Sequence, residues 1–220
     1  FDGNFKAINN LFMSRSGYGS ATGLFSTVNG ATLKNLYINN AYIQHLSSNT
    51  TNGVLVGTAT SSTINDIYIN DSNTYIANGY YGGAVGLMTN GTMSRVFVNN
   101  GGVTTTALNQ SIGGLIGENA GGTISETSAT GYITVISGTG NRVGGLVGYH
   151  SAGSITNSFS GVTIMLTTMS TLSTTKVGGF VGEAAAAISN SYSTGLVLPN
   201  ASTTFGGFAG TSSVGITNSF

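Results

Sequence analysis

Residues 144–148 read Gly-Gly-Leu-Val-Gly, and residues 155–161 read Ile-Thr-Asn-Ser-Phe-Ser-Gly. A short apolar stretch beside or between glycines recurs along the chain. Its copies are anchored at Gly23, Gly53, Gly83, Gly114, Gly145, Gly179 and Gly207. The steps between these anchor glycines are 30, 30, 31, 31, 34 and 28 residues. A nearly constant period of this length indicates a repeat architecture, in which each repeat is one structural unit.

The rest of each repeat keeps its residue types in register with the anchor. An aliphatic position follows about ten residues later, at Leu33, Ile64, Met93, Ile124, Ile155, Ile188 and Ile216. A polar position stands two residues further on, at Asn35, Asp66, Arg95, Glu126, Asn157, Asn190 and Asn218. A mostly aromatic position comes two residues after that, at Tyr37, Tyr68, Phe97, Ser128, Phe159, Tyr192 and Phe220. No segment has a helical period, so short strands and turns are predicted.

Three short strands in 30 residues predict an all-β fold, a right-handed parallel β-helix of about seven coils. The hand follows from the general rule for crossovers between parallel strands. Residues 1–220 are expected to form one domain, in which residues 1–21 lead into the coils. The chain begins at Phe1 and stops midway through a repeat. We therefore expect it to be an internal segment of a longer polypeptide.

Equivalent positions of successive coils should stack about 4.8 Å apart, which is the spacing of strands in a sheet. We expect the aliphatic and aromatic positions to form columns inside the coil. The polar column should lie at a corner, where Asn tolerates a positive φ and its amide bonds to the amides above and below. Asp66, Arg95 and Glu126 alternate in charge at this position. They predict a ladder of ion pairs between coils.

The repeat resembles the GLUG motif. The resemblance rests on residues 144–148 with 155–161, and on residues 177–182 with Ile-Ser-Asn-Ser-Tyr-Ser-Thr-Gly at 188–195. It implies a β-helical part of a large prokaryotic surface or adhesin-like protein. The family offers no catalytic residue to carry over to this chain. Ser128 departs from the pattern at the aromatic position.

The composition excludes several classes of function. Six basic and six acidic residues cancel, and only 5% of the chain is charged, against about 25% in ordinary domains. Neutrality argues against nucleic acid and anionic membranes as partners. No apolar run is long enough to span a bilayer. The chain has no cysteine, and it carries no nucleophile, zinc or phosphate-binding motif. We expect no metal, no cofactor and no enzymatic activity.

Paired carboxylates offer the best alternative, which is an enzyme acting on polysaccharides. Glu118 and Glu183 hold the same position two coils apart, and Tyr149 holds it in the coil between them. Their expected separation of about 9.6 Å is close to the upper limit for an inverting glycosidase. The simpler interpretation is a solvated face of a rod. His45 and His150 lie four coils apart, and both are expected at the surface.

Carbohydrate binding without catalysis is a second alternative. Tyr18, Tyr42, Tyr75 and the pair Tyr80-Tyr81 lie outside the aromatic column and could stack on sugar rings. Glycosylation motifs occur at Asn49, Asn90, Asn109 and Asn200, a number no greater than chance gives. Three of these motifs fall in the variable loops, where a glycan could be accommodated.

Together these features predict a structural and adhesive rod that lies outside the cell or on its surface. Its expected partners are copies of itself joined end to end, or flanking repeats, together with glycans or a host surface. Assembly of such rods into a filament is a further expectation. The alternative function is a β-helical module that binds or cleaves carbohydrate.

Overall fold

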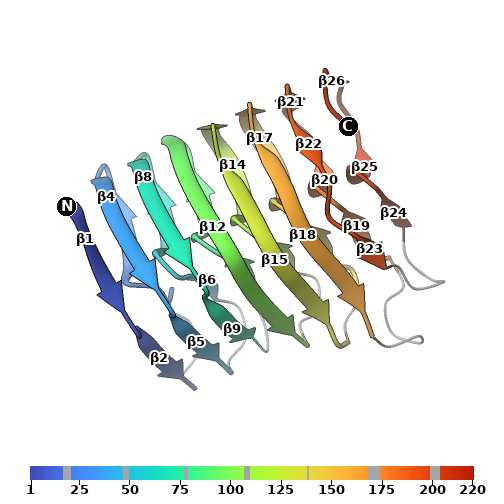
Figure 1. Cartoon of the computed structure of the whole chain (residues 1–220). Coiled ribbons are helices and arrows are strands. Elements are labelled where there is room, and N and C mark those ends of the chain that lie inside the picture. Colours follow the sequence, from blue (N-terminus) through green and yellow to red (C-terminus); the bar gives the residue numbers. More distant parts are fainter. Residues whose placement is uncertain are drawn as a thin grey trace.

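The computed structural model describes residues 1–16, 21–46, 50–76, 79–106, 110–137, 139–167, 174–198 and 204–220. Within these ranges the chain forms strands and turns and contains no helix. The strands wind into a solenoid, in which one strand of each coil lies beside its equivalent in the next (Figure 1). Every pairing between strands is parallel.

The larger sheet holds twenty strands, which line three faces of the coil. One face is built from β3 (Phe25–Asn29), β7 (Val56–Thr60), β11 (Val85–Thr89), β14 (Ile116–Ser125), β17 (Val147–Thr156), β20 (Val181–Ala184) and β25 (Ala209–Ser212). The next face, which bends at the polar corner, contains the ends of β14 and β17. Its other strands are β1 (Asp2–Asn9), β4 (Thr32–Asn39), β8 (Thr63–Asn70), β12 (Thr92–Thr105), β15 (Ser128–Val135), β18 (Phe159–Leu166), β21 (Ala187–Ser189), β22 (Tyr192–Ser193) and β26 (Ile216–Thr217). A third face is formed by β2 (Phe12–Arg15), β5 (Tyr42–His45), β9 (Asn73–Ile76), β23 (Val197–Leu198) and the ends of β12, β15 and β18.

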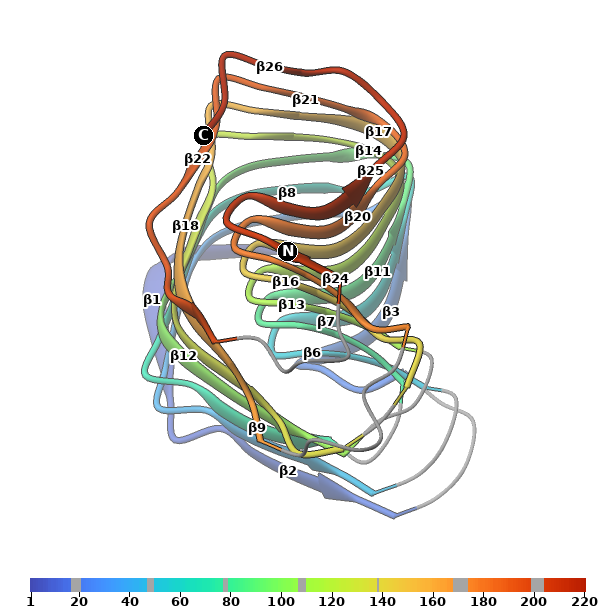
Figure 2. The same ribbon diagram turned by 90° about the vertical axis from the view of Figure 1, so that its right-hand side faces the viewer.

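A second sheet of six short strands lies within the outline of the cross-section (Figure 2). It consists of β6 (Thr51–Gly53), β10 (Tyr80–Gly82), β13 (Ser111–Gly113), β16 (Arg142–Gly144), β19 (Lys176–Gly178) and β24 (Thr204–Gly206). β6 ends at the anchor Gly53, and each of the other five strands ends at the glycine immediately before an anchor. There the chain turns sharply into the first face of the larger sheet. The residues of the turn are buried, as Leu115, Leu146 and Phe180 show.

The solenoid is right-handed and makes about 6 turns of about 31 residues. Viewed from the C-terminal end in Figure 2, the chain runs counter-clockwise while it advances toward the viewer. The seven predicted anchors delimit these turns, with one shift of register. Gly53 pairs with Gly82, and the pairing continues through Gly113, Gly144, Gly178 and Gly206, so Gly83 and every later predicted anchor lie one residue beyond the position equivalent to Gly53.

The glycine before the anchor turn cannot be replaced, because backbone atoms across the turn lie where its Cβ atom would be. A Cβ atom on Gly144 would collide with the carbonyl oxygen of Val147 across the turn, and it would press on the backbone nitrogen of Gly182. Gly82 and Gly113 face the same obstacle from Val85 and Ile116. Only a residue without Cβ allows this close approach.

The aliphatic column runs through the hydrophobic core along the solenoid axis. Its seven members are successive partners across the coils, from Leu33 with Ile64 to Ile188 with Ile216. The column is buried from Leu33 to Ile188, and Ile216 in the last coil is partly covered. The prediction of an interior aliphatic column is confirmed.

The aromatic column lies on the outer surface, so its expected place inside the coil is wrong. Tyr37, Tyr68, Phe97 and Phe159 are half-buried, while Tyr192 and Phe220 are exposed. Their rings do stack along the axis, at centroid distances of 4.7 Å for Tyr37–Tyr68 and 5.3 Å for Phe159–Tyr192. The stack is interrupted at Ser128, which is buried.

The polar position between the two columns explains this outcome. All seven of its members have a positive φ, from 47° at Asn218 to 57° at Asn35, including Arg95 and Glu126. A residue in this conformation breaks the period-two alternation of the strand. Consequently the residues on either side of the aromatic ring, such as Leu36 and Ile38 around Tyr37, point inward.

Candidate functional site: the outer columns of the solenoid

The carboxylates predicted as a pair share one outer column. Glu118, Tyr149 and Glu183 are successive partners on β14, β17 and β20. Across the anchor turn they face a column of the second sheet that contains Arg142 and Lys176. Lys176 Nζ lies 2.7 Å from one carboxylate oxygen of Glu183, and Arg142 Nε donates a short hydrogen bond to the other.

The two carboxyl groups have different environments. Burial raises the pKa of Glu118, against the effects of a hydrogen bond from Ser151 and the charge of Arg142. Burial also acts to raise the pKa of Glu183, but hydrogen bonds from Lys176 and Arg142 outweigh it and leave that pKa lowered. Opposite shifts of this kind accompany acid and base pairs in enzymes.

The space between the two carboxylates is nevertheless occupied. Tyr149 stands in the intervening coil, and the guanidinium carbon of Arg142 lies 4.4 Å from the centroid of its ring. Glu183 is neutralised by two cations, which compete with any role as a base. This arrangement joins the coil of Tyr149 to the coil of Glu183 through ion pairs and a cation–π contact.

The corner charges form the inter-coil pairs that the sequence suggests. Arg95 binds Asp66 through two hydrogen bonds, of 2.6 Å from Nε and 2.9 Å from Nη2. Its Nη1 lies 4.0 Å from the carboxylate of Glu126. The hydrogen bond from Arg95 lowers the pKa of Asp66. All three side chains reach solvent, so the ladder contributes little to stability.

Both histidines are buried, and their expected place at the surface is wrong. His150 receives a hydrogen bond at Nδ1 from the amide of Asn119, at 3.2 Å, and its Nε2 lies 3.2 Å from the carbonyl oxygen of Ala187. These partners fit the neutral ring with its proton on Nε2. Burial accordingly lowers the pKa of His150. His45 contacts Thr50 through Nδ1 at 3.1 Å.

The tyrosines proposed for sugar stacking separate into three groups. Tyr81 is buried in the core and donates a hydrogen bond to Thr74, while Tyr80 is half-buried. Tyr18 lies outside the described residues. Tyr42 and Tyr75, in contrast, border a shallow hollow of about 250 Å³ on the third face. Its other lining residues are Asn73, Thr74, Thr104 and Tyr132.

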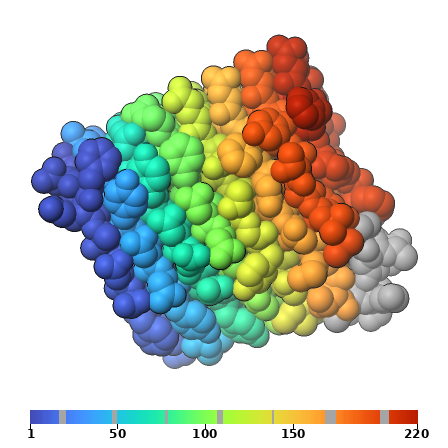
Figure 3. All heavy atoms as spheres, in the orientation of Figure 1, coloured from blue at the N-terminus to red at the C-terminus, as the bar shows by residue number. Residues whose placement is uncertain are grey.

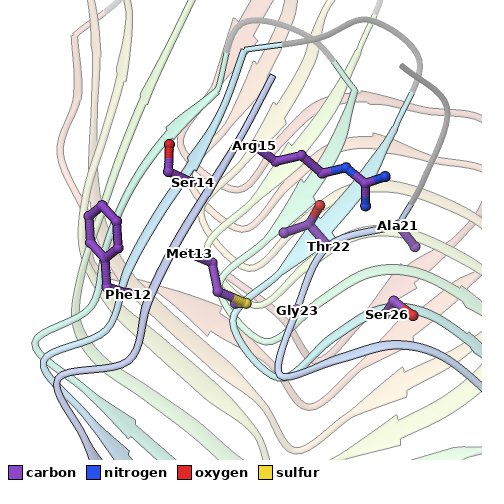
Figure 4. A pocket seen from close by; sticks show the side chains of 8 residues that line it. All are labelled: Phe12, Met13, Ser14, Arg15, Ala21, Thr22, Gly23 and Ser26. Carbon is purple, nitrogen blue, oxygen red and sulfur yellow. The ribbon is translucent and has the colours of Figure 1, made fainter. Parts of the chain in front are cut away.

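A larger hollow of about 660 Å³ opens at the N-terminal end (Figure 4). It lies between β2 and the segment that leads into β3, and its lining includes Met13, Arg15 and Thr22. Figure 4 shows the side chain of Arg15 reaching across from β2 toward Thr22. The hollow is the mouth of the interior of the first coil, where the core columns begin.

The candidate glycosylation sites are only partly within the described residues. Asn90 is exposed in the turn after β11, with a φ of 59°. Asn49, Asn109 and Asn200 lie outside the residues that the structure describes.

Sequence reasoning missed two outer features. One threonine position recurs in four consecutive coils and is exposed in each, at Thr32, Thr63, Thr92 and Thr123. It stands one residue before the aliphatic column, a constant offset that the sequence already displays. The second feature is Tyr132, which reaches two coils back to Asn73. No periodicity signals that contact.

Two further properties concern metals and membranes. Among the described residues, no group of three or more His, Cys, Asp or Glu side chains is placed to hold a metal ion. No helix long and apolar enough to cross a bilayer occurs in the same part of the chain.

Comparison with known proteins finds a family match for one coil. Residues 139–165 match the family model described as the GLUG motif. The chain carries a GLUG motif. The matched segment spans β16, the anchor turn, β17, the polar corner and most of β18. One GLUG motif is therefore nearly one coil, and the parallel solenoid is consistent with GLUG repeats. No curated protein and no solved structure matches the chain.

Proposed function

We propose that this GLUG-containing β-helix is a structural and adhesive segment of an extracellular rod, without catalytic activity. The observation that supports it best is the continuity of the interior columns. The aliphatic column runs in register from β4 to β26, and every coil is hydrogen-bonded to the next along the axis. Such a stack bends only by straining all of these bonds together, so it suits a stiff spacer.

Neutrality supports the same role. With six positive and six negative side chains in 220 residues, coils and neighbouring rods repel each other weakly. The GLUG resemblance adds the expectation of a surface location. Labelling intact cells of the source organism with an antibody against the chain tests this part. Signal without permeabilisation supports it, whereas signal only after permeabilisation overturns it.

The two end faces indicate how a rod would be extended. Phe205 is the last residue of an interior column that runs through Val143 and Val177, and it is 56% exposed. The mouth of the first coil is hollow at the other end. We propose that a further coil of the same cross-section covers each face. Unpaired strand edges favour such an addition.

Electron microscopy of the purified chain over a range of concentrations tests this stacking. We expect straight particles of constant width that lengthen as the concentration rises. Phe205→Glu should shorten them, because it places a charge on the face to be buried. Thr63→Glu, at an exposed side position, is the matched control and should leave length unchanged. Particles of one length at every concentration would contradict the proposal.

The alternative function of polysaccharide cleavage has one supporting observation, the opposite pKa shifts of Glu118 and Glu183. Against it stands Tyr149, which occupies the coil between them. Release of reducing ends from polysaccharides should therefore be absent, and Glu118→Gln should change nothing. Release that disappears in both Glu118→Gln and Glu183→Gln would establish an enzyme instead.

A further inference from the structure

The third face of the solenoid carries an aromatic hollow that the ladders do not account for. Two outer columns run along this face. One contains Phe12, Tyr42, Asn73, Gly102 and Tyr132 as successive partners, and the other contains Gln44, Tyr75 and Thr104. This face is turned toward the viewer in Figures 1 and 3, over β2, β5, β9 and the end of β12.

Gly102 makes room for the ring of Tyr132, which borders the hollow. It is the one member of its column without a side chain, and the ring of Tyr132 from the next coil lies over it. A Cβ atom at Gly102 would collide with that ring and with the amide of Asn73. The Tyr132 hydroxyl donates a hydrogen bond of 2.9 Å to Asn73 Oδ1. The bond holds Tyr132 along the axis, beside the coil that bears Tyr42.

The rings around the hollow are presented to solvent. Tyr132 is 40% exposed and Tyr42 is 39% exposed. Tyr42 is fixed from the other side, because its ring stacks on Phe12 at 5.7 Å with an interplanar angle of 7°. Rings held in this way bind a ligand at low conformational cost. Asn73 and Thr104 add an amide and a hydroxyl group to the lining of the hollow.

The chemistry of the lining selects a class of ligand. None of the six lining residues is charged, so an anionic or cationic ligand would find no counter-charge. Aromatic faces beside amide and hydroxyl groups suit a molecule with an apolar face and a hydroxylated rim. A pyranose ring has both. The outer threonine column has hydroxyl groups but neither a hollow nor exposed rings, and it lacks this combination.

We propose that the hollow formed by Tyr42, Asn73, Tyr75, Thr104 and Tyr132 binds a hexose unit of a neutral glycan. This proposal gives the proposed adhesive role a ligand. Its biological purpose rests on that role, but the binding itself can be tested without it. The volume of about 250 Å³ is below the range of pockets for larger ligands and suits one ring. Tyr42 and Phe12 continue the aromatic surface toward the N-terminal end, where a second unit would lie.

Binding of maltohexaose, cellohexaose and mannohexaose to the purified chain tests the proposal, by ligand-observed nuclear magnetic resonance and calorimetry. We expect at least one of them to bind, and Tyr132→Ala and Tyr42→Ala each to weaken it at least tenfold. Tyr132→Phe keeps the ring and loses only the hydrogen bond to Asn73, so a loss of a few fold is expected. An anionic oligogalacturonate should bind no better than the neutral chains.

Tyr192→Ala is the matched control, because Tyr192 is 38% exposed on another face and should leave binding unchanged. Absence of binding to all three neutral oligosaccharides at millimolar concentration would overturn the proposal. So would equal binding by the native chain, Tyr42→Ala and Tyr132→Ala. Microscopy of Tyr132→Ala separates the two proposals, since rods that lengthen normally but bind no sugar leave the structural role intact.

Discussion

The N-terminal and C-terminal coils build the same corner from different chemistry. In the first three full coils, the residue after the polar corner is Leu36, Ile67 or Val96, and all three are buried. In the later coils the equivalent residues are Thr127, Ser158 and Ser191, which are equally buried. The backbone is the same in both, so the corner does not depend on aliphatic filling.

Hydrogen bonds replace apolar contact in the C-terminal coils. The Ser158 hydroxyl donates to the carbonyl of Thr156 at 2.8 Å and accepts from the backbone N–H of Thr127 at 3.2 Å. Ser191 repeats the pattern with Ser189 and Ser158. A buried hydroxyl bonded in this way links neighbouring coils through side chain and backbone together.

The next corner along the chain, at Asn40, Asp71 and Asn100, also differs between the two halves. The N-terminal coils carry a ladder of asparagine amides, in which Asn39, Asn70 and Asn99 each bond to the coil below at 2.8–2.9 Å. The C-terminal coils have Thr130 and Gly161 at this corner, and β12 contains one more residue than β15 between their paired segments. The GLUG match at residues 139–165 covers one of the C-terminal coils, in which Ser158 fills the polar corner.

The anchor turn, rather than the filling of the corner, is therefore the common requirement of the fold. Burial of a large aliphatic side chain contributes about 1.5–3 kcal/mol, against about 0.5–1.5 kcal/mol for a neutral hydrogen bond. The N-terminal corner should therefore be the more stable of the two. The glycines that end the strands of the second sheet, such as Gly82 and Gly144, serve both halves equally.

The largest expected effect comes from the anchor turn. Gly82→Ala in the N-terminal half and Gly144→Ala in the C-terminal half should each destabilise the chain by about 4 kcal/mol or more, because the new Cβ meets backbone that cannot move. Urea unfolding measures both. Gly207→Ala is the control, because Gly207 lies one residue beyond the position equivalent to Gly82 and Gly144, and nothing lies near its Cβ position. A tolerated Gly144→Ala would contradict a shared turn.

The corners should respond unequally to truncation. Ile67→Ala leaves a cavity in a packed core and should cost about 2–5 kcal/mol. Ser158→Ala removes a hydrogen bond and leaves a buried N–H of Thr127 unpaired, at a cost of about 1–3 kcal/mol. Urea midpoints of the two variants decide the order. A larger loss for Ser158→Ala would reverse the proposed ranking of the two halves.

Acid should weaken the C-terminal half through His150. Its pKa is lowered in the folded chain, so the unfolded chain binds the proton more readily. Stability is complete above the ordinary histidine pKa of about 6.5 and falls as the pH drops below it. Unfolding at pH 7 and pH 5.5 measures this slope, and His150→Gln should reduce it. If stability fell with pH as steeply in His150→Gln as in the native chain, the acid sensitivity would arise from another group.

The smallest effect is expected at the corner ion pairs. Arg95→Asn removes the bonds to Asp66, but asparagine tolerates the φ of 51° better than arginine does. The two effects oppose each other, so the urea midpoint should change little. High salt should reduce any remaining difference in urea midpoint between the native chain and Arg95→Asn. A strong loss of stability that persists in high salt would show that the ladder matters more than its exposure indicates.

The repeat predicts much of the fold and little of the site. The offsets of Leu33, Asn35 and Tyr37 predict the columns, and asparagine at the polar position predicts the corner. The inward place given to Tyr37 fails because a positive φ at Asn35 reverses the alternation beyond it, which a count of spacings ignores. The hollow around Tyr132 depends on Gly102, whose missing side chain leaves room for the tyrosine ring. Gly102 is not one of the repeated positions, so the sequence pattern does not predict the hollow.

Disulfide formation between designed cysteines tests the one-coil register most directly, because the chain has no cysteine of its own. Thr63 and Thr92 are Cα partners in adjacent coils, within the separation that a disulfide spans. The pair Thr63→Cys with Thr92→Cys should therefore cross-link on mild oxidation. Thr63→Cys with Thr123→Cys, two coils apart, should stay reduced within one molecule. Equal cross-linking of both pairs, or of neither, would contradict the stacked register.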